Sequence, residues 1–349
     1  MNFASDNTSG AAPEILDALT RANDGNVPSY GADDLTAAVE AKFKEIFETD
    51  LSAHLVATGT AANSLSLACA VPPFGAVIAH EASHIAYDEC NAPEFYMGGA
   101  KITGLVGPHG KLQADDVDRA LTAYGKGVVH RAQPAAVSVA QATEAGTVYT
   151  KDEIGALADI CRKHDIVFHM DGARISNAIA QQGRSPAELT WKAGVDVLVF
   201  GATKNGALGV EAVIFFNKDL AREFEFRRKR GGHLFSKGRF LAAQMLAFLE
   251  DNLWLRLAHQ ANEMAYRLGR GLQDIDGVDL CHPVGANLVF ATLPPPIHKA
   301  LRRAGAQYHP WIVPGDLANG KMIRLVTNFS TTAEEVDQFL SVAREAAHA

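Results

Sequence analysis

Two short apolar runs in the middle of the chain each lead to a chemically reactive side chain. The run over 166–170 is followed at once by Asp171, and the run over 196–200 is followed shortly by Lys204. Apolar runs of this length next to helix-like segments are typical of buried parallel strands. Because ligands of open α/β sheets bind outside the carboxyl ends of the strands, the pattern predicts that this acid and this amine face one ligand.

A lysine and a carboxylate in one crevice are the side chains that pyridoxal 5′-phosphate requires. The cofactor forms a Schiff base with a lysine, and a carboxylate keeps its pyridine nitrogen protonated. The pair alone decides little, because an aspartate at a strand end is more often a cap or turn residue and a lysine there is more often a solvated charge. The other motifs must decide between these interpretations.

Composition limits the class of protein and its partners. The 349 residues are 48% hydrophobic, enough for a large core and two domains. The 40 acidic and 32 basic residues give a net charge of −8, which argues against nucleic acid as a partner. There is no apolar run of about 18 residues and no signal-like start, so we expect no membrane partner. The four cysteines lie far apart, which predicts reduced thiols in the cytoplasm and no metal site.

Strand and helix patterns alternate through the first two-thirds of the chain. This alternation predicts an α/β fold whose large domain has a mainly parallel, seven-stranded type of sheet covered by helices on both faces. The expected strands cover 54–57, 76–79, 101–105, 134–139, 166–170, 196–200 and 210–216, and the expected helices cover 13–21, 35–48, 64–70, 112–123, 151–164 and 219–230.

The C-terminal part has a different pattern. Long helical patterns run over 240–272, followed by expected strands over 288–291 and 322–326 and a last helix over 332–346. This predicts a smaller α+β domain over 255–349. The N-terminal arm and the large domain then make up 1–254, and the arm could pack on the small domain.

Two motifs near the first strands allow both a structural and a functional interpretation. Gly59, Thr60 and Ala61 open a helix, where backbone N–H groups could surround an anion or simply form a capped turn. His80 and His84 lack a third metal ligand nearby, so structural histidines are the default. In a pyridoxal site, however, the His84 ring could stack on the cofactor and relay a proton.

Two arginines likewise allow both a structural and a functional interpretation. Arg230 ends an expected helix before two glycines, which is typical of ordinary C-capping, although a cation there could also reach a phosphate. Lys237 and Arg239 are equal candidates for that contact. Arg324 lies inside an expected strand, where it either faces solvent at a sheet edge or holds a carboxylate with two parallel hydrogen bonds.

Together the motifs resemble those of the low-specificity L-threonine aldolases, which are pyridoxal-phosphate enzymes of the aspartate-aminotransferase fold, fold type I. The resemblance covers most of the chain in the right order. It is carried by Asp6-Asn7 with Gly10, Ser29-Tyr30-Gly31 with Asp33, Gly59-Thr60-Ala61-Ala62-Asn63, the His84 segment, Gln141 with Thr143-Glu144 and Gly146-Thr147, His169-Met170-Asp171-Gly172-Ala173-Arg174, Gly201 with Thr203-Lys204-Asn205-Gly206, and Arg324-Leu325-Val326-Thr327.

The resemblance implies a role for each candidate residue. It makes Lys204 the Schiff-base lysine, Asp171 the partner of the pyridine nitrogen and His84 the residue stacked on the ring. The other implied contacts are Gly59, Thr60 and Ala61 to the phosphate, and Ser5, Arg174 and Arg324 to the substrate carboxylate and cofactor edge. It also implies a homodimer or homotetramer with sites at the dimer interface, where Tyr30 and the Arg230 region come from the neighbouring chain.

The implied reaction is the cleavage of a β-hydroxy-α-amino acid to glycine and an aldehyde. His84, or a water that it holds, is the expected base. The segment around Lys204 differs from the Ser-Leu-Ser-Lys type of another threonine-aldolase branch, so threonine, allo-threonine and phenylserine all remain possible substrates, with either configuration at the β carbon. A β-eliminating lyase and an aminotransferase are alternatives within pyridoxal chemistry. A nucleotide-binding or NAD-dependent α/β protein is the alternative outside it, although the chain has no GxGxxG or Walker motif.

Overall fold

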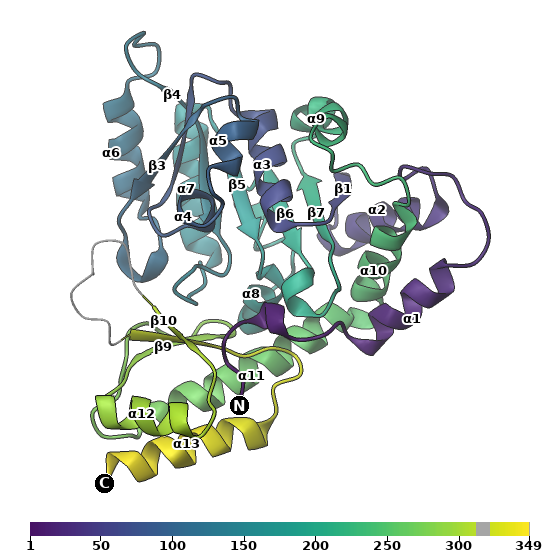
Figure 1. The fold of residues 1–349 in the computed structure, drawn as a ribbon. Helices are drawn as coiled ribbons and strands as arrows, with labels where there is room; N and C mark the ends of the chain where they lie inside the picture. Colours follow the sequence, from purple (N-terminus) through teal and green to yellow (C-terminus); the bar gives the residue numbers. More distant parts are fainter. Residues whose placement is uncertain (312–321, 349) are drawn as a thin grey trace.

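A seven-stranded sheet with its covering helices forms the larger part of the computed structural model, which describes residues 1–311 and 322–348 (Figure 1). The strand order is β1-β7-β6-β5-β4-β2-β3, and within this sheet only β7 runs against the others. The mainly parallel α/β fold expected from the sequence is therefore confirmed. The strands are β1 Ser52–Val56, β2 Gly75–His80, β3 Lys101–Leu105, β4 Gln133–Ala140, β5 Val167–Gly172, β6 Val197–Gly201 and β7 Glu211–Phe215.

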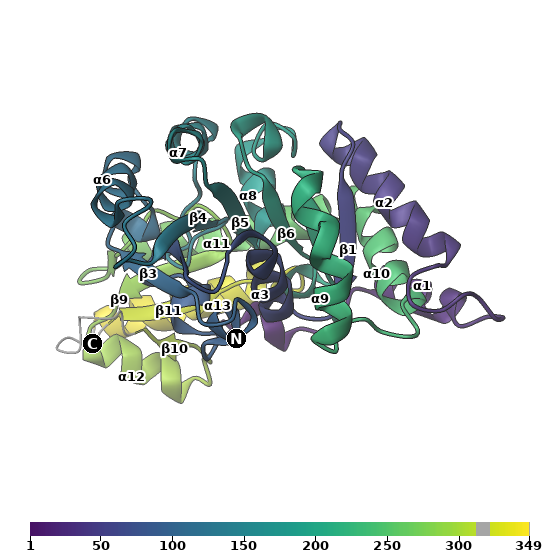
Figure 2. The ribbon, with the colours of Figure 1, turned by 90° about the horizontal axis from the view of Figure 1, so that it is seen from above.

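Helices cover both faces of this sheet (Figure 2). Successive side chains of β6 point to opposite faces, so Leu198 and Phe200 pack into one core cluster and Val197 and Val199 into another. The first face is covered by α1 Pro13–Ala22, α2 Asp34–Phe47, α6 Ala114–Tyr124, α7 Lys151–His164, α8 Ile175–Gln182 and α10 Arg239–Leu249. The second is covered by α3 Gly59–Ala70, α4 His84–Tyr87, α5 Ala92–Tyr96 and α9 Phe224–Arg230.

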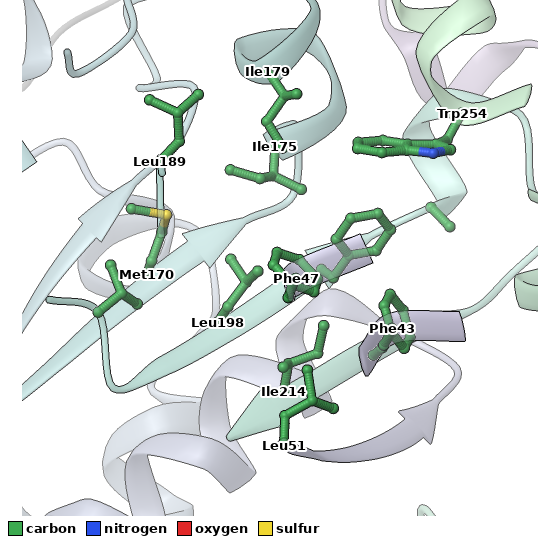
Figure 3. Packing of buried hydrophobic residues seen from close by; sticks show 14 of the residues in the cluster. Phe43, Phe47, Leu51, Met170, Ile175, Ile179, Leu189, Leu198, Ile214 and Trp254 are labelled. Atoms are coloured by element: carbon green, nitrogen blue, oxygen red, sulfur yellow. The ribbon is translucent and has the colours of Figure 1, made fainter. Parts of the chain in front are cut away.

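Aromatic packing holds the first face against its helices (Figure 3). Phe43 and Phe47 of α2 lie with their ring centroids 5.2 and 6.3 Å from that of Phe200, and Trp254 lies 5.6 Å from it. All four side chains are fully buried. Truncating one such ring to alanine typically costs about 3–5 kcal/mol, so this cluster fixes the strand that leads to Lys204.

Capping residues set several helix starts. Thr150 and Glu153 form the predicted capping box of α7, and Thr332 and Glu335 form another at the start of α13 Ala333–Ala347. The helix predicted from residue 64 begins earlier, at Gly59, because the Thr58 side chain caps it. Short 3₁₀ helices lie at Asp6–Thr8, Pro108–Gly110, Trp191–Ala193, Thr203–Asn205, Lys218–Glu223 and Glu250–Asn252.

Two predicted helical stretches contain breaks that the sequence analysis did not locate. The helical patterns predicted over 240–272 are interrupted at Glu250–Asn252, where Asp251 and Asn252 adopt left-handed φ values of 49° and 54°. The predicted helix over 219–230 divides into a 3₁₀ helix and α9. Local breaks of this kind leave little trace in hydrophobic periodicity, because the apolar face continues on both sides.

The C-terminal part has its own antiparallel sheet, ordered β10-β11-β9-β8. Its strands are β8 Asp279–Leu280, β9 Leu288–Thr292, β10 His309–Pro310 and β11 Met322–Val326, and its helices are α11 Leu253–Gln273, α12 Pro295–Arg303 and α13 Ala333–Ala347. The sequence analysis missed β8, β10 and α12. The two strands have two residues each, and α12 starts on prolines, which fit only the first turn of a helix.

Helix α11 belongs to both parts of the molecule. Its first residues, Leu253 and Trp254, lie in the core of the large sheet, whereas Met264 and Leu268 lie in the C-terminal core. We therefore propose that the boundary between domains 1–254 and 255–349 falls in the first turn of this helix. None of the described helices combines the length and apolar character needed to cross a membrane.

The N-terminal arm packs against the C-terminal part, as the sequence analysis suggested. Phe3 is fully buried there, with its ring centroid 5.3 Å from that of Phe339. Its backbone N–H donates to Gln307 O at 2.8 Å, and its carbonyl oxygen accepts from Val326 N–H at 2.9 Å. The arm thereby carries the residues that follow it toward the edge of the large sheet.

Candidate active site

A cavity of ≈ 290 Å³ lies beside the large sheet, at the side where the carboxyl ends of its parallel strands meet. Residues that follow β1, β4, β5 and β6 line it, together with the first residue of β7, which reaches this edge because that strand runs the opposite way. This volume is close to the lower end of the range for small-molecule sites, about 300–1,000 Å³. Six predicted site residues line it, namely Gly59, Thr60, His84, Asp171, Arg174 and Lys204.

A tight turn after β6 presents Lys204. At Gly201 an added Cβ would lie 2.6 Å from Ala173 O, so only glycine allows the close approach of this strand end to its neighbour. The turn ends at Gly206, whose φ of +108° also favours glycine. Between them, the Asn205 side chain donates to Trp254 O at 2.8 Å. The backbone that carries Lys204 is therefore held on both sides.

The surroundings of Lys204 favour the neutral amine. Burial lowers the pKa of Lys204, and the positive charge of Arg174 lowers it further, while the negative charges of Asp6, Asp171 and Glu211 oppose this shift. A neutral amine is the form that can attack a carbonyl carbon. The position therefore suits a lysine that forms a covalent bond with a cofactor.

Asp171 is fixed by two hydrogen bonds. The Asn63 side chain donates to Oδ2 at 2.9 Å, and Ala173 N–H donates to Oδ1 at 2.9 Å. Each oxygen can accept a further bond from a ligand. On the same strand His169 contacts Ser66 and Ser138, and burial lowers the pKa of His169 to about 4, so this histidine is neutral.

His84 is held by two glutamates that the sequence analysis did not assign. Its Nδ1 donates to Glu89 Oε1 at 2.8 Å, and its backbone N–H donates to Glu144 Oε1 at 2.8 Å. The bond to Glu89 raises the pKa of His84, whereas burial opposes the rise. Because Nδ1 is occupied, Nε2 is the nitrogen left to exchange a proton with a ligand. The other histidine of the motif, His80, bonds Gly107 O at 3.1 Å.

Arg174 forms an ion pair with Asp6, a residue to which the sequence analysis gave no role. Its Nε and Nη2 donate to the two oxygens of Asp6 at 2.7 and 3.0 Å, and Asn287 donates to Asp6 Oδ2 at 3.0 Å. Burial acts to raise the pKa of Asp6, but the charge and hydrogen bonds of Arg174 outweigh it, so the pKa lies below its ordinary value. The pair fixes the guanidinium and uses two of its five N–H donors.

Five predicted site residues lie outside this cavity, as far as the described residues define it, and three of these are Ser5, Ala61 and Arg324. Ser5 caps the short helix Asp6–Thr8, accepting from Asn7 N–H at 3.2 Å. Ala61 donates its N–H to the Thr58 side chain at 3.2 Å, so this N–H serves the helix cap. Arg324 lies on β11, which has a neighbour on each side, so the alternative of a sheet-edge arginine was wrong.

Arg324 has an aromatic and a charged environment. Its guanidinium lies 4.7 Å from the centre of the Trp311 ring, and Nη2 donates to Ala4 O at 3.4 Å. Burial lowers the pKa of Arg324, as does the positive charge of Arg174, whereas Asp6 and Asp88 oppose the shift. The two arginines are thus close enough to act on one another.

Tyr30 and Arg230 do not share the Lys204 cavity among the residues described. Tyr30 is 48% exposed and lines a different cavity with His54 and Glu225. Lys229 Nζ lies 4.7 Å from the centre of its ring. Arg230 is exposed at the end of α9. Their contribution to the site of a neighbouring chain therefore stays a prediction.

Comparison with known proteins identifies the family. The family model described as beta-eliminating lyase matches residues 2–294. The low specificity L-threonine aldolase of Pseudomonas aeruginosa is 46% identical to this chain over 314 residues, which cover 90% of each chain. The chain belongs to the low-specificity L-threonine aldolase family.

Solved structures agree with this assignment. The threonine aldolase of Leishmania major matches with a TM-score of 0.92 and 29% identity over 99% of both chains. The aspartate aminotransferase of Thermus thermophilus, at 16% identity, matches with a TM-score of 0.73 over 99% of this chain and 91% of that chain, which shows a shared fold. This member of the threonine aldolase family is a carbon–carbon lyase that depends on pyridoxal phosphate.

The groups around the cavity fit that cofactor. Thr58, Gly59 and Thr60 line it at the N-terminus of α3, where backbone N–H groups and the helix dipole favour a phosphate. The space beside Gly59 is open, since an added Cβ there would meet nothing within 4 Å. Lys204 and Asp171 supply the amine and the carboxylate at other walls of the same cavity.

Proposed function

We propose that this chain cleaves L-threonine and related β-hydroxy-α-amino acids to glycine and an aldehyde. One observation carries the proposal: Lys204, Asp171 and the His84–Glu89 pair line one cavity in a chain that is 46% identical to a low specificity L-threonine aldolase. L-allo-threonine and phenylserine belong to the same proposed substrate class, because they carry the same hydroxyl group next to the same Cα.

The proposed cofactor contacts follow from the walls of the cavity. When bound, pyridoxal phosphate supplies the electron sink that allows a bond at the substrate Cα to break. Lys204 would hold its carbonyl carbon, Asp171 its protonated ring nitrogen, and the N-terminus of α3 its phosphate. The His84 imidazole lines the same cavity and would stack on the ring.

His84 is the proposed base for the β-hydroxyl proton. The proton would move to Nε2, or to a water bound there, because Nδ1 already donates to Glu89 at 2.8 Å. Glu89 is nearly fully buried, so its carboxylate would stabilise the imidazolium that forms. Glu89 thereby orients the ring and also favours its charged form.

Arg174 and Arg324 are proposed to hold the substrate carboxylate. Asp6 fixes Arg174 through two hydrogen bonds, and Trp311 lies against the Arg324 guanidinium. A substrate held at its carboxylate and its amine has a fixed rotation about its Cα–N bond. This rotation decides which of the other three bonds of Cα, to hydrogen, to the carboxylate carbon or to Cβ, is aligned for cleavage. These arginines would therefore select Cα–Cβ cleavage by geometry.

We further propose a cytoplasmic homodimer or homotetramer with sites at the dimer interface. Tyr30 and Arg230 are exposed and lie outside their own chain's cavity, which suits a contribution to a neighbouring copy. The four cysteines are free thiols, which suits a reducing compartment.

Borohydride trapping tests the proposed chemistry directly. The purified protein should absorb at about 410–430 nm and lose this band on reduction, because a lysine imine of pyridoxal has these properties. The reduced pyridoxyl group should then be attached to Lys204. L-threonine should yield equimolar glycine and acetaldehyde. Lys204→Ala should abolish both results, whereas Lys218→Ala, a surface lysine paired with Asp50, should retain them. A colourless protein, or an active Lys204→Ala variant, would refute the proposal.

A further inference from the structure

Glu211 is the one charged residue of an otherwise apolar strand. It begins β7, whose other residues are Ala212-Val213-Ile214-Phe215, and it is 7% exposed. Its neighbours in register are Val56 on β1 and Gly201 on β6. Burying a carboxyl group here costs free energy unless its contacts compensate for the lost water. The contacts of Glu211 therefore indicate what the residue does.

Those contacts lead to the turn that carries Lys204. Glu211 Oε2 accepts the backbone N–H of Ala202 at 2.9 Å, two residues before the lysine. One residue before Glu211, Val210 N–H donates to the Thr203 hydroxyl at 3.1 Å. Because β6 and β7 are antiparallel and Gly201 pairs with Glu211, the hairpin brings the carboxyl group back to this turn.

Glu211 also contributes charge to the lysine. Both residues line the same cavity, and the charge of Glu211 acts against the lowering of the Lys204 pKa. The other charged groups that act on Lys204 are Arg174 just after β5, Asp171 within β5 and Asp6 in the N-terminal segment. Glu211 differs from these three because its own side chain accepts a hydrogen bond from the lysine turn, at Ala202 N–H.

The protonation of Glu211 changes near neutral pH. Burial raises the pKa of Glu211 to about 7, although hydrogen bonds from Thr203 and Ala202 and the charge of Lys204 act in the opposite direction. The negative charge of Asp171 adds to the rise. The charge beside the lysine therefore depends on pH in the range where enzymes of metabolism usually work.

Building on the proposed function, we propose that Glu211 is a positioning residue for Lys204, with two separable effects. Its carboxyl oxygen holds the lysine turn through Ala202 N–H, and its negative charge favours the protonated form of the lysine nitrogen. The residue does not need to touch substrate for either effect. It would set the pH range over which the cofactor-bound lysine is protonated and ready for reaction.

Glu211→Gln separates the charge from the hydrogen bond, because the amide retains the size and an oxygen acceptor for Ala202 N–H. The readout is a pH titration of the visible absorbance of the bound cofactor in the holoenzyme without substrate. We expect the midpoint to move to lower pH by about one unit, since an opposite charge has been removed next to the lysine nitrogen. Cofactor affinity should change little.

Glu144→Gln is the matched control. Glu144 lines the same cavity and burial likewise raises its pKa to about 7, but its carboxylate bonds the His84 backbone and not the lysine turn. Its substitution should leave the midpoint at the wild-type value. An unmoved midpoint in Glu211→Gln, or equal shifts in both variants, would overturn the charge effect.

Glu211→Asp tests the positioning effect separately, so this half of the proposal can still be overturned if the glutamine variant does not fold. The shorter side chain retains the charge but cannot reach Ala202 N–H, so the cofactor dissociation constant should rise roughly 5- to 10-fold, as for the loss of one hydrogen bond. Wild-type affinity would overturn the positioning effect. An absent band or a label away from Lys204 in the wild type would instead refute the proposed function, so the two failures are distinguishable.

Discussion

Asp6 is the residue that makes Arg174 a fixed cation. Asp6 is buried and Arg174 is largely so, the two side chains are joined by two hydrogen bonds, and Asn287 of the C-terminal part bonds the same carboxylate. Such a pair is strongly destabilised when one partner loses its charge, because the other charge stays buried without compensation. Asp6 therefore links the arm, the large sheet and the C-terminal part at one point.

Asp6→Asn should lower the free energy of unfolding by ~3–5 kcal/mol at pH 7. Because the folded pKa of Asp6 lies below the ordinary 3.8, its contribution is complete above that pH and is lost as pH falls through the folded value. Denaturant unfolding at pH 7 measures the loss. Asp337→Asn, which breaks an exposed pair with Arg267, is the control and should have a small effect.

Arg324→Lys should lower kcat/KM, although the charge is retained. The expected loss of transition-state stabilisation is roughly 2–4 kcal/mol. An ammonium group cannot make two parallel bonds to a carboxylate and cannot stack on Trp311 as a guanidinium does. The cofactor absorbance should persist, because Arg324 is not proposed to bind it. Normal turnover together with a less stable fold would show that Arg324 is structural. Arg267→Lys serves as the surface control.

The sequence analysis found the residues whose signal is local and missed those whose signal is tertiary. Asp171 and Lys204 could be predicted because each follows a buried apolar run. Glu144 lies 60 positions from His84, which it contacts through the backbone N–H. Nothing in the spacing of the two residues indicates that they meet. Asp6 and Arg174, 168 positions apart, are a similar case.

At the scale of elements, the end of β6 requires glycine at position 201. Gly201→Ala would place a Cβ 2.6 Å from Ala173 O, which the backbone can relieve only by moving the lysine turn. We expect a loss of about 1–3 kcal/mol in stability and weaker cofactor binding, measured by thermal unfolding and absorbance. In contrast, Gly155→Ala in α7 has open space and should stabilise the protein by about 0.5–1 kcal/mol. Equal effects of the two substitutions would contradict this explanation.

Element types were easier to predict than their directions. The apolar run that became β7 was recognised as a strand, but its sequence does not show that it runs against β6. Direction depends on the length of the connection, and only the folded hairpin shows that Glu211 reaches the same edge as Lys204. For this reason the sequence analysis gave Glu211 no role. The N-terminus of α3 was predicted to be either a cap or an anion site; the Thr58 side chain forms the cap, and the anion site stays a prediction.

At the scale of the whole molecule, the buried glutamates should make the cofactor-free protein less stable as pH rises. Above pH about 4.5 the unfolded chain has lost the Glu211 proton, whereas the folded chain retains it until pH about 7. Stability should therefore fall across this interval, by on the order of 1–3 kcal/mol from Glu211. Denaturant unfolding of the apoprotein at several pH values measures the slope. Glu211→Gln should reduce the slope and leave the part that comes from Glu144, and an unchanged slope would contradict the prediction.

The position of β1 at the edge of the sheet has a consequence for the order of events during synthesis. Within the described sheet β1 hydrogen-bonds to β7. Val56 can therefore pair only after Glu211, 155 residues later, has been synthesised. At about 5–20 residues per second, a ribosome needs roughly 8–30 seconds to make that stretch. The first strand and the Thr58–Thr60 turn behind it are finished early but can dock only then. We expect nascent chains that stop before β7 to contain both the residues after β1 and the residues around Lys204, but no assembled cavity.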